Sequence, residues 1–183
     1  MQTKDRKKLF STQLLVLMAL LVALQVVLGK IVQINLISKE LNLGFLPVAL
    51  AGALLGPVPA AVVGALGDLI GSLLFPTGAY FPGFTLTSAL VGLAYGLALH
   101  GKKPSWVWVI VAAVSGAAIN LLLNSLWLSM LYGSKTYWGW IAARAGSYLV
   151  ETPVQVVVIY LMLTVFSRIR LPKAFRPDGK ETK

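Results

Sequence analysis

The chain has 183 residues, of which 57% are hydrophobic and 12% are charged, and its mean hydropathy is +0.80. Soluble domains of this length carry about 25% charged residues, so the composition excludes a soluble protein and indicates a single transmembrane domain over residues 1–183. The absence of cysteine and the single histidine exclude disulfides, thiolate-bound metals and histidine-based catalysis, so we expect neither a metal nor a cofactor.

Apolar runs predict an all-α membrane protein with six transmembrane helices. Their approximate bounds are 9–29, 45–55, 60–74, 85–99, 106–131 and 141–167. The first run is long enough to span a bilayer and no small-residue cleavage site follows it, so we expect a retained helix rather than a signal peptide. A mixed loop, KIVQINLISKELNLG, separates the first two runs.

The net charge of +10 comes mainly from basic residues outside the apolar runs. Residues 1–8 form a basic N-terminus, HGKKP lies midway along the chain, and residues 169–183 form a basic tail. Lysine and arginine next to membrane spans mark cytoplasmic ends. The charge therefore predicts that both termini lie in the cytoplasm, as an even number of helices requires, and it does not indicate a nucleic-acid partner.

Proline and glycine interrupt the apolar runs at two places. GPVP at 56–59 separates the second and third helices, because proline removes a backbone donor and clashes with the preceding turn. FPTGAYFPGFTLTS at 75–88 combines two prolines, two glycines and four aromatic residues with no charge. Irregular backbone at membrane depth needs protein or a wet cavity to cover it, so this stretch predicts an outward lid over a ligand. The alternative is an interfacial belt of aromatic residues.

Four charged residues fall inside the predicted helices or at their ends: Lys30, Asp68, Arg144 and Glu151. Charges at membrane depth are costly and tend to line a cavity or a site. With both termini in the cytoplasm, all four lie in the outer half of the membrane or near its middle. They predict a pocket that opens outward.

Polar residues also repeat at helical spacing on two helices. The stripes comprise Arg144, Tyr148, Glu151 and Gln155 on the last helix, and Asn120, Asn124 and Trp127 on the fifth. Each set falls on one helix face, and two facing polar stripes suit a flat ligand that forms hydrogen bonds. The alternatives are that the asparagines and Glu151 only bond between helices, and that Asp68 is an internal partner of a cation.

Small residues one turn apart let helices approach closely in lipid. The first helix carries Ala19 and Ala23 at this spacing. The second and third helices carry Gly52, Gly56, Gly64, Gly67 and Gly71. The pattern fits either packing inside the bundle or a docking face for another membrane protein.

Several strings in these helices carry a family resemblance. They are GFLPVALAGALLGPVPAAVVGALGDLIG at 44–71, FPTGAYFPGFTLTSALVGLAYG at 75–96 and NSLWLSMLYG at 124–133, together with the alanine pair. From about residue 11 to 166 the chain resembles a substrate-binding S-component of an energy-coupling factor (ECF) transporter. Among these proteins it is most similar to the folate-specific members.

The resemblance implies a transport function without catalysis. Such proteins bind a vitamin on the outer side of the bacterial cytoplasmic membrane and then associate with a transmembrane coupling subunit and two ATPase subunits. ATP hydrolysis there makes the S-component topple and release its cargo inward. The sequence agrees with a component that is not itself an ATPase, since it holds no P-loop motif. Ala19 and Ala23 match the small-residue motif on the face that meets the coupling subunit.

Folate would need three kinds of contact: stacking for its flat pterin, acceptors for the donor-rich pterin edge, and cations for the two carboxylates of its glutamate tail. The candidates are Tyr80, Phe81, Phe84, Trp127 and Tyr132 for stacking, Asp68, Asn120, Asn124 and Glu151 for the edge, and Lys30 and Arg144 for the tail, with Tyr148 on the same stripe. At the end of the first helix the family often has Ser-Arg where this chain has Gly29-Lys30, which keeps the charge and loses the guanidinium fork.

Three other functions remain as alternatives. Within the same family, the ligand is another vitamin such as thiamin, riboflavin or a pyridoxine-like compound. Outside it, an intramembrane enzyme would have to pair Ser115 with His100, which lies at the cytoplasmic end of a different helix, about three turns away in depth. A channel or structural subunit without a ligand would leave the clustered outer polar residues unexplained.

Overall fold

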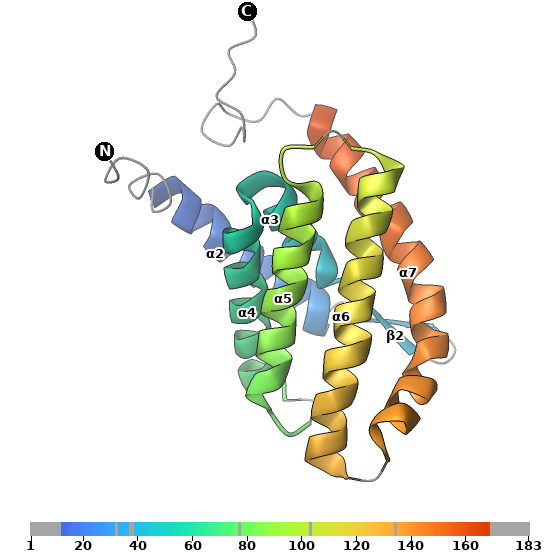
Figure 1. Ribbon diagram of the computed structural model, residues 1–183. Coiled ribbons are helices and arrows are strands. Elements are labelled where there is room, and N and C mark those ends of the chain that lie inside the picture. The colour runs from blue at the N-terminus through green and yellow to red at the C-terminus, as the bar shows by residue number, and fades with distance from the viewer. Residues whose placement is uncertain are drawn as a thin grey trace, which may run out of the picture.

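The computed structural model describes residues 12–31, 33–36, 39–76, 78–102, 104–133 and 135–168. Its elements in order are helix α2 (Thr12–Val26), π-helical turn η1 (Val27–Ile31), strands β1 (Gln33–Leu36) and β2 (Lys39–Asn42), and helices α3 (Phe45–Leu55), α4 (Pro57–Leu74), α5 (Pro82–Leu99), α6 (Trp106–Tyr132) and α7 (Tyr137–Arg168). Figure 1 shows α4, α5, α6 and α7 as an upright bundle, with α2 running obliquely beside it. The basic segments 1–8 and 169–183 lie outside the described residues.

The helices confirm a membrane protein, with one correction to the expected spans. Five helical segments of the described chain are long and apolar enough to cross a membrane, with bounds Thr12–Lys30, Pro57–Leu74, Pro82–Leu99, Trp106–Tyr132 and Tyr137–Phe166. Helix α3 is apolar but has only 11 residues. At 1.5 Å per residue it rises about 16 Å, roughly half the thickness of a hydrocarbon core. The predicted helix at 45–55 is therefore present, but it is shorter than a full span.

The segment between η1 and α3, which was expected to be a loop, adds a short hairpin to the all-helical fold. Strands β1 and β2 pair antiparallel, with Ile34 opposite Leu41 and Asn35 opposite Glu40. The sequence QINL alternates polar and apolar residues, and a period of two favours a strand over a helix. A loop that is too polar for a helix inside lipid thus satisfies its backbone by forming a short hairpin.

Helices α4 and α5 begin at prolines, three residues earlier than predicted. Proline lacks a backbone N–H and fixes φ near −65°, and both properties suit the first helical position, where no intrahelical donor is needed. Pro57 and Pro82 therefore start helices instead of merely separating them. Gly56 joins α3 to α4 with φ at +96°, a value that only glycine adopts without strain.

The apolar core occupies the half of the bundle near the α5–α6 connection. One cluster includes Tyr95, Leu99, Val109 and Ile159, from α5, α6 and α7. A second cluster joins α2, α3 and the first half of α4. The other half of the bundle is where the polar residues gather.

Glycines on α4 and α5 bring these two helices into backbone contact. A Cβ atom added at Gly92 would overlap the carbonyl of Ala60, and one added at Gly96 would overlap Pro57. Gly52 and Gly64 meet α5 in the same way, through the backbone of Tyr95–Gly96 and of Ser88 respectively. Packing inside the bundle therefore accounts for these glycines.

We expect Gly92→Ala to lower the thermal unfolding midpoint of the protein, although alanine usually stabilises a helix relative to glycine by about 0.5–1 kcal/mol. The added methyl group meets backbone atoms of α4 that have no rotamer to change, and such overpacking costs about 1–3 kcal/mol. Gly146→Ala is the matched control, because a Cβ atom at this helical glycine meets nothing within 4 Å. Equal midpoints for the two variants would contradict close packing of α4 on α5.

Candidate ligand-binding site

Two cavities lie in the polar half of the bundle and adjoin each other. The first has a volume of about 320 Å³ and is lined by residues of α2, η1, α3, α4, α5, α6 and α7. The second has a volume of about 300 Å³ and lies nearer the α4–α5 connection. Lys30, Asp68 and Ser88 line both. The shared residues show that the two cavities are neighbours in the polar half of the bundle.

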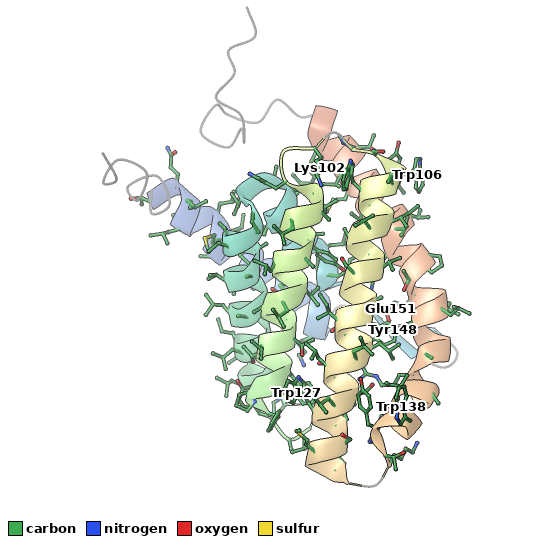
Figure 2. The ribbon with its side chains drawn as sticks, in the orientation of Figure 1. Lys102, Trp106, Trp127, Trp138, Tyr148 and Glu151 are labelled. Carbon is green, nitrogen blue, oxygen red and sulfur yellow. The ribbon has the colours of Figure 1, made fainter. Side chains whose placement is uncertain are left out.

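The first cavity collects all four of the charged residues that the sequence placed at membrane depth. Lys30 comes from η1, Asp68 from α4, and Arg144 and Glu151 from α7. Figure 2 shows Glu151 and Tyr148 on the side of α7 that faces α6. A cavity lined by two cations and two carboxylates offers a zwitterionic or polar ligand contacts of both signs.

Arg144 lines this cavity, and one of its two terminal nitrogens has no hydrogen-bond partner among the described residues. Its Nη2 donates a hydrogen bond to the Tyr148 hydroxyl over 3.1 Å, while Nη1 is buried and has no hydrogen-bond partner among the described residues. One turn further on, Gln155 Nε2 donates to Glu151 Oε1 over 3.0 Å. The stripe predicted on the last helix is therefore present, and its hydrogen bond to Tyr148 holds the guanidinium in place.

Asp68 is held by neighbours on α5 and faces both cavities. Thr85 Oγ1 donates to its Oδ2 over 2.9 Å, and the Tyr80 hydroxyl lies 3.1 Å from the same threonine oxygen. Lys30 interacts with it electrostatically, and the lysine chain passes over Gly71, where an added Cβ atom would lie 3.3 Å from Lys30 Cε. Asp68 thus has an internal partner, as the alternative interpretation expected, and is also accessible to a ligand.

The two asparagines of α6 are bonded along their own helix. Asn120 Nδ2 donates to the Gly116 carbonyl over 3.1 Å, and Asn124 Nδ2 donates to Asn120 Oδ1 over 3.2 Å. Asn124 Oδ1 is buried without a hydrogen-bond partner in the described part of the chain. Since Asn120 lines the first cavity and Asn124 the second, the pair leaves an acceptor free beside the second cavity rather than joining two helices.

Three of the five predicted stacking residues line the second cavity: Tyr80, Phe84 and Tyr132. The connection between α4 and α5 contributes through Gly78 and Ala79 as well. The segment predicted as a lid therefore borders the second cavity, and its last part, from Pro82 onward, is the first turns of α5. The aromatic rings give this cavity the walls that a flat ligand needs.

Phe81 and Trp127 stand behind this wall and line neither cavity. The Phe81 ring centroid lies 5.5 Å from that of Trp127 and 6.3 Å from that of Phe84. Trp127 Nε1 donates to the hydroxyl of Thr87, which is fully buried, over 3.0 Å. Figure 2 shows Trp127 between α5 and α6. Its indole supports the cavity wall from the interior of the bundle.

Comparison with known proteins decides the family. Residues 13–163 match the family described as "ECF transporter, substrate-specific component". The chain belongs to this family. The resemblance in its sequence motifs is thereby confirmed, and the protein is a multi-pass S-component of the cytoplasmic membrane.

The relatives that this S-component resembles are named as folate transporters. It is 32% identical over 158 residues to the folate transporter FolT of Clostridium novyi, covering 86% of this chain and 91% of the relative. It is 33% identical over 160 residues to FolT of Leuconostoc mesenteroides, covering 83% and 85%. A crystal structure of FolT bound with folic acid superposes with a TM-score of 0.76 at 34% identity, covering 87% of this chain and 97% of that one.

Several residues of the S-component line the first cavity without having been singled out from its sequence. They include Gln25, Phe45, Ser88 and Tyr95. Gln25 Nε2 donates to the Gly64 carbonyl over 3.4 Å, and its Oε1 is buried with no partner in the described residues. Gln25 is the one polar residue in the run 14–29, and this interruption of an apolar run is the signal that would have identified it. Ser88 and Tyr95 follow Phe84 at i+4 and i+11, one face of α5.

Proposed function

We propose that this S-component binds folate and delivers it across the cytoplasmic membrane together with a coupling subunit and two ATPase subunits. The observation that carries the proposal is the match to FolT bound with folic acid, which extends over 97% of that chain at 34% identity. The polar space in the bundle supports it independently, because its chemistry suits each part of folate.

The cavity residues divide into three groups by the part of folate that each one suits. Lys30 and Arg144 supply positive charge for the carboxylates of the glutamate tail. Asp68 and the free acceptor of Asn124 suit the amino and N–H donors of the pterin edge, and Glu151 and Asn120 lie beside them. Tyr80, Phe84 and Tyr132 provide surfaces for ring stacking, with Phe81 and Trp127 behind them; Tyr148 orients Arg144.

We infer that the binding space opens to the outside and that both termini lie in the cytoplasm. Figure 1 places the start of α2, the α5–α6 connection and the end of α7 at the same end of the bundle. The three basic clusters of the sequence are adjacent to these points, and positive charge favours the cytoplasmic side. The second cavity borders the α4–α5 connection at the opposite end.

Ala19 and Ala23 are proposed to dock against the coupling subunit. Both are exposed on α2, on the same face as Leu15, Leu20 and Leu24, so they are available for a partner. A small-residue pair on an exposed apolar helix face lets a second transmembrane helix approach closely. Gln25, which lines the first cavity, lies on a different face of α2 from these alanines.

A tryptophan fluorescence titration of the purified protein tests the ligand. Folate is expected to change the emission at submicromolar concentration, because Trp127 contacts Phe81, which in turn contacts the cavity residue Phe84. Thiamin, riboflavin and pyridoxine at the same concentrations serve as controls and are expected to give no change. Saturation by one of these vitamins, with no response to folate at micromolar levels, would show that this vitamin is the ligand.

A further inference from the structure

Lys102 holds its ammonium in a defined position at the turn between α5 and α6. Its Nζ lies 3.2 Å from the centroid of the Trp108 ring and donates a hydrogen bond to the Leu97 carbonyl over 3.4 Å. The side chain is exposed. Because an ammonium has three N–H donors, these contacts leave donor capacity directed at the surroundings.

This positive charge has no carboxylate beside it in the described part of the chain. The acidic side chains described there are Asp68 and Glu151, and both line the first cavity in the other half of the bundle. The sequence has no acidic residue between positions 69 and 150. The turn is therefore complementary to an anion.

The surface next to the ammonium is apolar and exposed. Leu97 on α5 is 64% exposed, and Trp108 and Val111 on α6 are 40% and 45% exposed. All three lie within segments long enough to cross a membrane. Trp106, which stacks on Tyr160 with ring centroids 4.0 Å apart, adds an exposed indole of the kind that sits at the membrane–water boundary. The ammonium thus lies where a headgroup would be, beside apolar surface suited to an acyl chain.

We propose that the α5–α6 turn binds an anionic phospholipid, with the lipid phosphate on Lys102 and an acyl chain along Leu97, Trp108 and Val111. A free phosphate ion would use only the ammonium, whereas a phospholipid also covers the exposed apolar residues. The site lies at the end of the bundle opposite the second cavity, so it does not depend on the identity of the transported vitamin. Its effect is to anchor this end of the S-component to one leaflet.

Native mass spectrometry of the purified full chain tests the site, with phosphatidylglycerol and phosphatidylcholine of matched acyl chains titrated side by side. The expected result is a preference for phosphatidylglycerol of roughly five-fold, since one lysine near a membrane surface contributes about 1 kcal/mol towards anionic lipid. Lys102→Gln is expected to abolish the preference, and Lys102→Arg to keep it. A thermal unfolding midpoint equal to that of the unaltered protein confirms that the glutamine variant is folded.

Lys135→Gln is the matched control, because Lys135 also lies over an indole, at 5.3 Å from the Trp140 ring centroid, but at the α6–α7 connection. It is expected to keep the lipid preference. A preference that survives in Lys102→Gln, or that is lost equally in Lys135→Gln, would overturn the proposal. Displacement of phosphatidylglycerol by millimolar inorganic phosphate would also overturn it, by showing an anion site with no role for the acyl chain.

Discussion

Replacing Arg144 by alanine is expected to weaken folate binding by about 100-fold, which corresponds to two charge-assisted hydrogen bonds of about 1.4 kcal/mol each. The guanidinium lies in the first cavity, is anchored to Tyr148 by one nitrogen, and keeps the other nitrogen buried and unpartnered in the described structure. In the alanine variant the ligand carboxylate has no guanidinium to bind, and a hydrogen bond of this kind is strongest in a low-dielectric cavity. A fluorescence titration of the variant with folate measures the effect.

Two comparisons make this result specific. Arg144→Lys keeps the charge but not the planar fork, so its affinity should fall between those of the alanine variant and the unaltered protein. Pteroic acid lacks the glutamate tail, so its binding should change much less than that of folate when Arg144 is removed. Unchanged folate affinity in Arg144→Ala, or equal losses for the two ligands, would remove Arg144 from the tail contact.

Asp68→Asn is expected to weaken folate and pteroic acid binding by the same factor, about 10- to 100-fold. The carboxylate accepts from Thr85, interacts with Lys30 and faces both cavities, so it is positioned for the pterin, which both ligands carry. Asparagine keeps the shape and loses the charge that strengthens hydrogen bonds from the pterin donors. Parallel titrations with the two ligands measure the loss.

Thr85→Val is the control for this prediction, because it removes the donor to Asp68 and leaves the carboxylate in the cavity. Its affinity for both ligands should fall less than that of Asp68→Asn. Equal losses in the two variants would show that the hydrogen bond between Thr85 and Asp68 accounts for the effect. They would contradict a direct contact between Asp68 and the pterin. A loss confined to folate would move Asp68 from the pterin edge to the tail.

Local composition was enough to predict the class of protein and most of its helices. Apolar runs, a shortage of charge and basic clusters at their ends depend only on neighbouring residues, and all six predicted helices are present in the described chain. The errors lie where local signals compete. Pro57 and Pro82 break a helix from inside but favour its first turn, and residues 33–36 and 39–42 form strands where a loop was expected.

The binding site also combines residues that the sequence could identify with arrangements that only the packing of the helices shows. Intramembrane charge identified Lys30, Asp68 and Arg144 one by one, because each is costly in lipid wherever it sits along the chain. From the sequence, Phe81 and Trp127 could not be distinguished from the aromatic residues that line the second cavity. Only the hydrogen bond from Trp127 to Thr87 on α5, 40 positions earlier in the chain, places this indole behind the cavity wall.

The sequence by itself determined that this protein spans a membrane, that it carries unusual charges at depth, and that its helices hold the motifs of an S-component. These are properties of segments of a few turns, set by hydropathy and residue type. The tertiary structure decided which of those charges meet. Lys30 and Asp68 line one space because glycines let α2, α4 and α5 approach closely, and contacts between residues so far apart in the chain arise only when the helices pack.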